Sequence, residues 1–326
     1  MISVIVPNHN GSATIGTCLH SLFSSRYQAF EVIVVDDCSS DNSIDIIRQF
    51  PCRLIRLDRH GGAAKARNTG ARESCGDVLF FIDADCVVQE DTLARVAEAY
   101  QNSPDSVTGG SYTPVAHDDC FYSTFQSVFI NYSELRNPAP DYIASHAMVI
   151  GKGIFEKSGG FAEDFMPILE DVEFSHRLKR AGVRLSMDSA ILVRHIFNFT
   201  LTKSLRNAMK KTKYWTGYSL GNSDLTNDSG TSSRELKINV ASSCMSWFLL
   251  LCSLLSRESL FLLSMLIVAT LNIIFSRGLI QAFFRIKGWP FGIRAALYYC
   301  FVYPLPIVAG GISGTLFYFQ TRRTAS

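Results

Sequence analysis

The segment VLFFIDAD (residues 78–85) runs from an apolar stretch directly into two aspartates, Asp83 and Asp85. A short apolar run closed by polar residues is typical of a buried strand. The segment VIVVDD (32–37) repeats this pattern and ends in Asp36 and Asp37. Ligands of open α/β sheets bind beyond the carboxyl ends of the strands. The four aspartates therefore lie where a ligand is expected.

Strand and helix signals alternate through the first hundred residues. Apolar runs predict strands at 2–6, 31–35, 52–57 and 77–82, and helical spacing predicts helices at 15–22, 43–50, 62–73 and 93–100. This alternation predicts an α/β fold with βαβ units and a mainly parallel sheet. No GxGxxG or Walker A sequence follows any of these strands, which disfavours the dinucleotide-binding and P-loop folds.

The pattern becomes irregular between residues 106 and 194, as expected where an acceptor site is added to a nucleotide-binding half. Two features stand out there. Glu170 and Asp171 open a helical pattern over 170–181, which Gly182 ends. His195 ends a strand-like stretch at 190–194. A third acidic site and a histidine thus join the first four aspartates as candidate functional residues.

The composition sets limits on the kind of partner. The 326 residues include 47% hydrophobic residues, and the formal net charge of +2 is too small to favour nucleic acid as a partner. The nine cysteines include no CxxC pair, so we expect reduced core residues and no zinc site or disulfide framework. Because a strand pattern begins at Ile2, we expect a cytosolic N-terminal part without a signal peptide.

The C-terminal third is apolar enough to suggest a membrane region. Segments 240–256 and 259–275 approach the length of a spanning helix, and only Arg257 and Glu258 separate them, which predicts a helical hairpin. A third apolar segment, 295–319, contains two prolines and three glycines, and we expect it to be kinked or partly re-entrant. Arg322 and Arg323 after it argue against a full crossing, which leaves its topology open.

A basic stretch precedes this region. Residues 201–215 combine five lysines and arginines with Trp215, which fits a helix lying on anionic lipid. A solvated charged helix face is the alternative. Residues 221–239 are rich in polar side chains and are predicted to form a linker.

Asp83 and Asp85 have the chemistry of a metal site. Residues two apart on a strand project to the same side. Their oxygens suit Mg²⁺ or Mn²⁺, which bind through one or two carboxylates together with substrate phosphates. A solvated Asp-rich turn is the alternative for such a pair alone. The second acidic pair, Asp36 and Asp37, follows an upstream parallel strand and favours the ligand-binding interpretation.

Seven segments in this order resemble the family-2 glycosyltransferases of the GT-A fold. They are VIVPNHN at 4–10, VIVVDDCSSDNS at 32–43, GGAAKARNTGA at 61–71, FFIDADC at 80–86, GGF at 159–161, EDVEFSHRLKRAG at 170–182 and VRH at 193–195. The resemblance covers roughly residues 1–215 and implies a Rossmann-like catalytic domain that binds a nucleotide-sugar, usually a UDP-sugar.

The resemblance also assigns donor-binding and metal-binding residues. It implies that Asp36 and Asp37 contact the base and ribose. Asp85, together with Asp83, would hold a Mg²⁺ or Mn²⁺ ion on the diphosphate, and His195 would approach that ion. Further donor-binding candidates are Pro7, Asn10 and Lys65. Lys65 is equally explained as an exposed residue of a glycine-opened helix, and His195 as a structural residue at a strand end.

Glu170 and Asp171 match the ED motif of the family, in which the aspartate is the general base. Inverting transfer requires a carboxylate that takes the proton of the acceptor hydroxyl as that oxygen attacks the anomeric carbon. The alternative is that both acids only stabilise the positive end of the helix they open. Processive members carry a QxxRW segment, whereas 211–215 reads KTKYW and retains only Trp215, which favours transfer of a single sugar.

The sequence therefore predicts an inverting glycosyltransferase with catalytic residues Asp171 and Glu170. The predicted domains are a GT-A domain at 1–220, a linker at 221–239 and a membrane region at 240–326 with two to three helices. We expect a cytoplasmic catalytic domain at the cell membrane and a lipid-linked or membrane glycan acceptor. A polyprenyl-phosphate sugar synthase, whose acceptor needs no general base, and a non-catalytic membrane scaffold are the alternatives.

Overall fold

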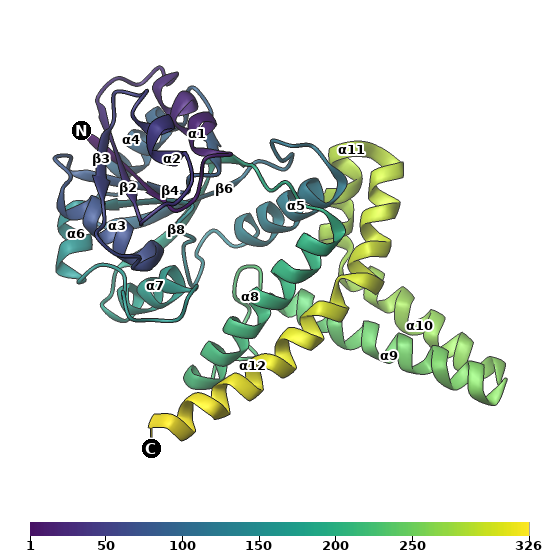
Figure 1. Cartoon of the computed structure of the whole chain (residues 1–326). Helices are drawn as coiled ribbons and strands as arrows, with labels where there is room; N and C mark the ends of the chain where they lie inside the picture. Colours follow the sequence, from purple (N-terminus) through teal and green to yellow (C-terminus); the bar gives the residue numbers. More distant parts are fainter. Residues whose placement is uncertain (326) are drawn as a thin grey trace. The chain divides into compact units, whose positions relative to one another are not determined.

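The chain divides into two compact units, each drawn in Figure 1. The structure is a computed structural model that describes residues 1–325, with side chains described up to Arg322, so the predicted role of Arg323 lies outside the described side chains. The sheet unit comprises Met1–Asp119 and Glu134–Asn198. The helical unit comprises Cys120–Ser133 and the residues from Phe199 onward.

The sheet unit alternates strands and helices in its first half, as predicted. Its elements are β1 (Ile2–Asn8), α1 (Ile15–Phe23), β2 (Phe30–Asp36), α2 (Ser43–Ile47), β3 (Arg53–Arg56), α3 (Gly62–Arg72), β4 (Val78–Ile82), β5 (Cys86–Val88), α4 (Thr92–Asn102), β6 (Ser106–Tyr112), β7 (Ala147–Gly151), α6 (Lys152–Lys157), α7 (Glu170–Arg180) and β8 (Arg184–His195).

One sheet of eight strands organises this unit, in the order β3-β2-β1-β4-β7-β6-β8-β5. The pairings among β3, β2, β1 and β4 are parallel, as is that of β6 with β8. Strand β7 is antiparallel to both of its neighbours, and β5 is antiparallel to β8. The prediction of a mainly parallel α/β sheet is confirmed.

The part predicted to be irregular contains β6, β7 and α6, which the apolar pattern did not reveal. Strand β6, SVTGGSY, is buried throughout although it is rich in small residues. A Cβ at Gly109 would lie 2.8 Å from Met187 Sδ, and one at Gly110 would lie 2.4 Å from Ile191 O. Because β8 passes so close, this strand needs glycine where a hydrophobic pattern would place a larger residue.

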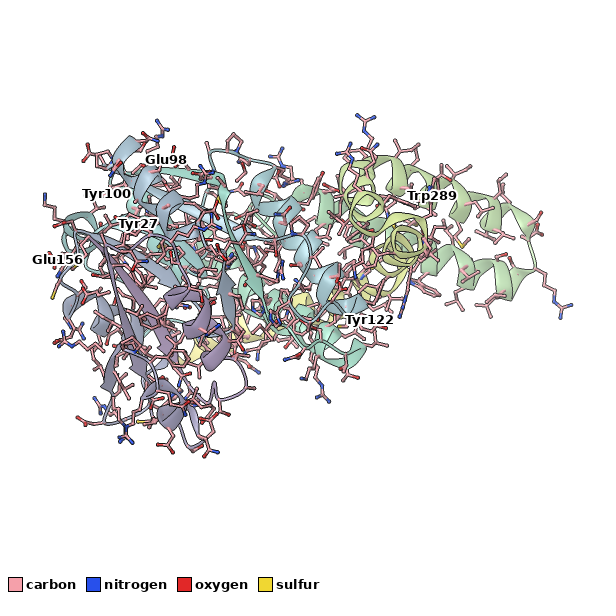
Figure 2. All side chains as sticks on the ribbon, turned by 90° about the horizontal axis from the view of Figure 1, so that it is seen from above. Tyr27, Glu98, Tyr100, Tyr122, Glu156 and Trp289 are labelled. Atoms are coloured by element: carbon pink, nitrogen blue, oxygen red, sulfur yellow. The ribbon has the colours of Figure 1, made fainter. Side chains whose placement is uncertain are left out.

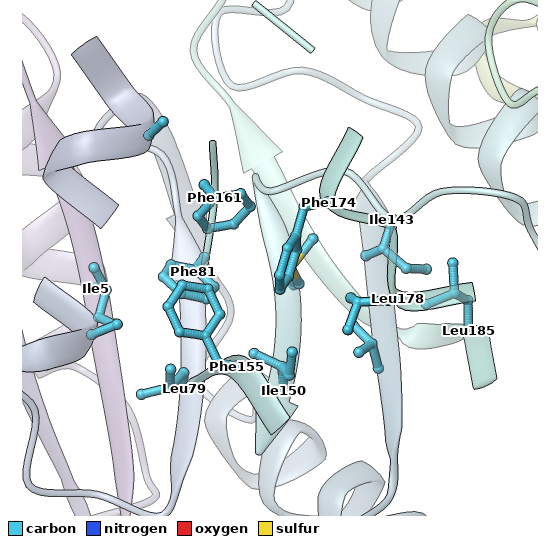
Figure 3. Close-up of a cluster of buried hydrophobic side chains, with 14 residues drawn as sticks. Ile5, Leu79, Phe81, Ile143, Ile150, Phe155, Phe161, Phe174, Leu178 and Leu185 are labelled. Carbon is cyan, nitrogen blue, oxygen red and sulfur yellow. The ribbon is translucent and has the colours of Figure 1, made fainter. Parts of the chain in front are cut away.

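A hydrophobic core joins the sheet to α6 and α7. Phe81 of β4 lies against Phe155 and Phe161, with both pairs of ring centroids 5.2 Å apart. Phe174 of α7 contacts Phe161 at 4.8 Å, and Figure 3 shows these rings together between the strands and the helices. Burial of the apolar face of α7 fixes the helix that begins with Glu170 and Asp171.

The helical unit contains most of α5 (Phe121–Leu135) and all of the C-terminal elements. These are α8 (Leu201–Asn222), α9 (Arg234–Ser256), α10 (Ser259–Phe275), α11 (Arg277–Leu297), the π-helix η1 (Tyr298–Val302) and α12 (Pro304–Ala325). Helices α9 and α10 lie side by side in Figure 1, and the chain turns between them at Arg257, whose φ is 60°.

Apolar side chains cover the outside of the α9–α10 hairpin. Leu254 is 70% exposed, Leu255 78% and Leu260 67%. The green hairpin in Figure 2 shows side chains projecting from both helices into open space. Trp289 of α11, labelled in the same figure, is also exposed. An apolar surface of this kind marks a contact with lipid or with another protein.

The predicted third apolar segment is interrupted. Within α11 the chain leaves helical geometry at Lys287 and Gly288, and Figure 1 shows the ribbon reversing there. The π-helix η1 follows, and α12 begins at Pro304, where proline needs no backbone donor. In η1 the carbonyl of Tyr299 accepts a 2.9 Å hydrogen bond from Nδ2 of the buried Asn239. The Oδ1 atom of Asn239 in turn accepts a hydrogen bond from Asn272 Nδ2.

Among the described residues, two helical stretches are apolar and long enough to cross a membrane, Arg234–Ser256 and Arg277–Arg322, and the shorter Ser259–Phe275 is also apolar. The second stretch includes the reversal at Lys287–Gly288 and is not one straight helix. Core helices of soluble proteins meet the same criteria, so this gives weak support to the predicted membrane association.

The helices near residue 220 run across the predicted border between the GT-A domain and the linker. Helix α8 runs to Asn222 and packs against α12, so it groups with the helical unit and not with the sheet. Within the predicted linker at 221–239, α9 begins at Arg234, and Ser233 Oγ caps it by accepting a hydrogen bond from Leu236 N. The extents of the functional domains stay predictions.

Candidate active site

Polar side chains gather where the central parallel strands end. Asn8 and Asp36 end the paired strands β1 and β2, and Asp83 follows β4, which lies on the other side of β1. His195 ends β8. This is the edge at which α/β sheets bind ligands.

Asp36 and Asp37 hold two loops at this edge. Buried Asp36 accepts hydrogen bonds from Asn8 Nδ2 at 2.9 Å and from Ser39 N at 3.1 Å. Asp37, also buried, accepts from Gly61 N at 2.7 Å and from Gly62 N at 2.8 Å, and so satisfies donors at the start of α3. Both carboxylates are thus structural members of the edge, and their predicted contact with base and ribose stays a prediction.

The other predicted donor residues lie on the same edge. Pro7 is part of β1 and pairs with Val35. Exposed Asn10 has φ of 51°, and its Oδ1 accepts a 2.8 Å hydrogen bond from Ser40 N. Lys65 is half-buried on α3 and lies against Gly61, where an added Cβ would come within 2.4 Å of its Cδ.

Asp85 and His195 form a pair that could hold a metal ion. Asp85 Oδ2 lies 3.4 Å from His195 Nε2, and together with Cys86 these residues place three ligand atoms within 4.8 Å of one another. The antiparallel register of β5 and β8, which sets Cys86 opposite His195, brings them together. Burial, followed by the charges of Asp85 and Asp83, raises the pKa of the Cys86 thiol well above its usual range. The carboxylate of Asp85 and the imidazole of His195 are therefore the more readily available ligands of this group.

Asp83, predicted to hold a metal ion together with Asp85, pairs with a buried cation, and its role at the metal stays a prediction. Its Oδ1 accepts a 2.7 Å hydrogen bond from Arg67 Nη2, and Arg67 Nη1 donates at 2.6 Å to Glu170 Oε1. Arg67 lies on α3, and its side chain is 4% exposed. One buried cation therefore joins the acid that follows β4 to the first acid of α7.

The two acids on Arg67 respond differently to their surroundings. Burial alone would raise the pKa of Asp83, but the Arg67 charge and hydrogen bond, together with the nearby His146 and His195, outweigh burial and lower that pKa. Burial raises the pKa of Glu170, and the Arg67 charge offsets only part of the effect. For Arg67, burial alone would lower the pKa, but Asp83 and Glu170 raise it, so the guanidinium stays charged.

Asp171 is held at the start of α7. Its Oδ2 accepts a hydrogen bond from Ser145 N at 3.0 Å, and Ser145 Oγ lies 3.4 Å away. Leu169, the residue that precedes the helix, has φ of 80°, which is uncommon for a bulky residue and typical of strained backbone at functional sites. This conformation turns the chain directly before Glu170 and Asp171.

Several residues that support the site were not singled out from the sequence, although Arg67 and Asn68 lie within the GGAAKARNTGA segment. Asn68 Oδ1 accepts from Phe161 N at 2.9 Å, and its Nδ2 donates to Phe161 O at 2.8 Å, which fixes the GGF segment to α3. The ring of His195 stacks on Phe197 at 3.8 Å and meets Tyr112 edge-on at 4.9 Å. The hydrogen-bond partners of Arg67, Asn68 and Ser145 lie far away in the sequence. Their roles can therefore be recognised only once these partners are known from the structure.

Comparison with known proteins agrees with this geometry. The sequence model of the family described as Glycosyl transferase family 2 matches residues 3–155. The chain carries a family-2 glycosyltransferase domain. The matched part includes β1 to β7 and the residues Asp36, Asp37, Asp83 and Asp85, whereas α7, β8 and the helical elements after them lie beyond it.

Glycosyltransferases from bacteria are similar to part of this chain. An uncharacterized glycosyltransferase of Haemophilus influenzae is 38% identical over 105 residues, which is 32% of this chain and 36% of that protein. Glycosyltransferase GlyG of Streptococcus pneumoniae is 32% identical over 128 residues, or 37% of this chain and 42% of that protein. The chain thus matches less than half the length of either relative.

The fold is shared with solved structures. The mannosyltransferase PcManGT of Pyrobaculum calidifontis, in complex with GDP-Man and Mn²⁺, aligns with a TM-score of 0.60 at 16% identity. The alignment covers 96% of this chain and 86% of that one. The similarity confirms the GT-A fold that the sequence predicted.

Proposed function

We propose that the chain is an inverting, metal-dependent glycosyltransferase that moves one sugar from a nucleotide-sugar to a membrane-associated acceptor. The observation that carries the proposal is that Arg67 joins Asp83, beside the Asp85–His195 pair, to Glu170, beside Asp171. In a family-2 domain this arrangement is explained most simply by one site with two sides. The Asp85–His195 pair serves the leaving group, and Asp171 serves the acceptor.

Asp171 has the role of general base. Its carboxylate takes the proton of the acceptor hydroxyl as that oxygen bonds to the anomeric carbon, and the bond from that carbon to the nucleoside diphosphate breaks. The hydrogen bond from Ser145 N fixes the direction of the carboxylate. Arg67 holds Glu170 in place beside it. The acidic pair thus does more than stabilise the start of α7.

Asp85 and His195 fit a divalent ion, which when bound stabilises the charge that grows on the departing diphosphate. Of the predicted ions we favour Mn²⁺, because Mg²⁺ takes oxygen ligands and this pair includes an imidazole. PcManGT, which shares the fold, was solved with Mn²⁺. Rings of Phe197 and Tyr112 hold His195 in the orientation that the pair requires.

The donor is proposed to be a nucleotide-sugar, with a UDP-sugar as the first candidate. Asp36 and Asp37 shape the edge where the base and ribose would bind, and Pro7, Asn10 and Lys65 line its approaches. The relative TarS of Staphylococcus aureus, a poly(ribitol-phosphate) beta-N-acetylglucosaminyltransferase, is 34% identical over 102 residues, which is 29% of this chain and 18% of that protein.

The acceptor is proposed to lie in a membrane, as a polyprenyl-linked glycan or glycolipid, with the sheet unit on the cytoplasmic side. Support comes from the exposed leucines of the α9–α10 hairpin and from the basic residues of α8. A polyprenyl-phosphate sugar synthase is less favoured, because a phosphate acceptor would leave the positioned Asp171 without a task.

A screen of nucleotide-sugars tests the proposal. Full-length protein in detergent, supplied with Mn²⁺ and a membrane lipid extract, should release nucleoside diphosphate from one class of donor. Asp85→Ala should abolish this release while circular dichroism stays unchanged, because a ligand worth several kcal/mol of charge stabilisation is lost. Release that persists in Asp85→Ala contradicts the metal assignment, and no release from any donor favours the scaffold alternative.

A further inference from the structure

A second group of ligand atoms lies at the end of β2, apart from Asp85 and His195. His9, Asp37 and His60 each place one ligand atom within 4.8 Å of the others. Asp37 Oδ2 is 2.9 Å from His60 Nδ1, and the centroids of the two imidazole rings are 4.5 Å apart. Two ligands at about 2.1 Å from one ion are separated by about 3.0 Å at the right angles of octahedral coordination and by about 3.4 Å at tetrahedral angles.

The surroundings hold these ligands in place. Gly61 N and Gly62 N donate to the two oxygens of buried Asp37, so its carboxylate cannot turn away. His9 Nδ1 lies 2.7 Å from Asp37 O, where it donates as the protonated nitrogen. That tautomer leaves the lone pair on His9 Nε2, which accepts from Asn10 Nδ2 at 3.2 Å, a contact that a bound ion would replace. The hydrogen bond of Nδ1 to the backbone is of the kind that orients histidine ligands in metal sites.

We propose that His9, Asp37 and His60 form a binding site for a borderline transition-metal ion of the Zn²⁺ and Ni²⁺ class. Two imidazoles and one carboxylate suit such ions, whereas Mg²⁺ prefers oxygen ligands. Both histidines are exposed, with the His60 side chain at 61%, so an ion can enter from solvent and complete its coordination with water.

The site has a consequence for the enzyme, which rests on the proposed function. Asp37 is a predicted donor-binding residue, so an ion bound to it occupies the edge that the base and ribose would use. The ion and the nucleotide would then exclude each other. A transition metal at this site acts as an inhibitor that competes with the donor, whereas the ion on Asp85 assists the reaction.

Calorimetric titration with Ni²⁺ tests the site. The sample is the untagged full-length protein in detergent, and Ni²⁺ is chosen because it suits imidazole while the cysteines favour softer ions. His60→Ala and His9→Ala should each weaken binding at least about tenfold, since loss of even a supporting contact costs that much. The matched control is His20→Ala, an exposed histidine of α1, which should leave the affinity unchanged.

The titration is repeated in Asp85→Asn to remove the other metal site. Ni²⁺ binding that survives there and is lost in His60→Ala supports the proposal. Equal affinity in wild type, His9→Ala and His60→Ala overturns it, as does absence of binding in wild type. A last titration adds UDP. If UDP binds without displacing Ni²⁺, the metal site stands and the placement of the donor on Asp37 is wrong.

Discussion

Arg67 contributes more to this site than its sequence context indicates. Its guanidinium pairs with both Asp83 and Glu170. The guanidinium carbon also lies 5.8 Å from the centroid of the Phe161 ring, which connects these ion pairs to the hydrophobic core. A cation shared by two acids allows both to approach without repulsion. The same residue therefore stabilises the fold and spaces the acidic groups of the proposed site.

Arg67→Met should destabilise the protein by about 3–5 kcal/mol, because it leaves two partly buried carboxylates without their cation. Arg67→Lys should recover part of this loss, since one ammonium can meet one of the acids. Thermal unfolding followed by circular dichroism measures both. Arg72→Met is the matched control on the same helix, where the exposed pair with Glu163 at 3.8 Å should contribute less than about 1 kcal/mol. Equal losses at the two positions would count against the bridging role.

Asp171→Asn should remove sugar transfer while donor binding stays near wild type. The amide keeps the shape of the carboxylate and its place beside Ser145, but it cannot accept the proton. The loss should fall on kcat, at about 10²–10⁴-fold. Glu170→Gln should reduce turnover less. Turnover assays measure kcat, and calorimetric titration with UDP measures nucleotide binding. Normal turnover in Asp171→Asn would place the base elsewhere.

The raised pKa of Glu170 gives a pH dependence of stability. In the unfolded chain a glutamate titrates near about 4.3, whereas in the folded protein burial raises the pKa. The folded state therefore binds this proton more tightly, and its stability falls as pH rises from the unfolded to the folded pKa. The Glu170→Gln variant has no titrating group at this position and so lacks this pH-dependent contribution to stability. Its Tm relative to wild type should become more favourable as pH rises above about 4.3, and parallel curves would disprove the raised pKa.

At the scale of elements, the sequence predicted those whose burial follows an apolar pattern. The strands β1 to β4, helix α7 and the α9–α10 hairpin lie where the pattern placed them. The small residues of β6 gave no such signal, because close passage of β8 selects for glycine there. The acids at the strand ends could be identified because the apolar pattern shows where each strand ends. The role of Arg67 could not be identified, since its contact with Glu170 spans 103 residues.

Helices α8 and α12 pack through glycines on one face of α12. A Cβ at Gly310 would lie 2.6 Å from Met209 O, and one at Gly314 would lie 2.3 Å from Lys213 O. Gly311, one position along, has nothing within 4 Å of its added Cβ and presents a different face. Small residues of this kind let helix backbones approach closely.

Gly310→Ala should therefore lower the free energy of unfolding by about 1–3 kcal/mol through overpacking. Gly311→Ala should be neutral or stabilise by up to about 1 kcal/mol, because alanine favours the helix. Thermal unfolding of the two variants in the same detergent compares them directly. If both substitutions shift Tm in the same direction by the same amount, the packing of α8 on α12 is not what the glycines serve.

At the scale of the whole molecule, the sheet unit is discontinuous in sequence. The segment Cys120–Ser133 lies between its two parts but belongs to the helical unit. There Phe125 stacks at 5.2 Å on Phe283, and Phe129 contacts Tyr303 at 5.6 Å. No single truncation of the chain yields the sheet unit without these exposed rings.

A chain that ends at Asn198 should therefore aggregate without detergent. The double substitution Phe125→Ser and Phe129→Ser should make this short chain soluble, because it removes the apolar face that has lost its partners. The same two substitutions should destabilise the full-length protein, where both rings are buried. Size-exclusion chromatography measures the first effect and thermal unfolding the second. A monodisperse short chain with both phenylalanines intact would contradict this account.

Strand β8 lies between β6 and β5 in the sheet although it is the last strand to be synthesised. A nascent chain on the ribosome keeps the edges of β5 and β6 open until residues 184–195 have emerged. Arg67 can meet Asp83 early in synthesis, whereas Asp85 receives His195 only with this final strand. Under the proposed function, the ability to bind a catalytic metal ion would arrive with the completion of the sheet, and an unfinished chain would be kept from acting on the donor.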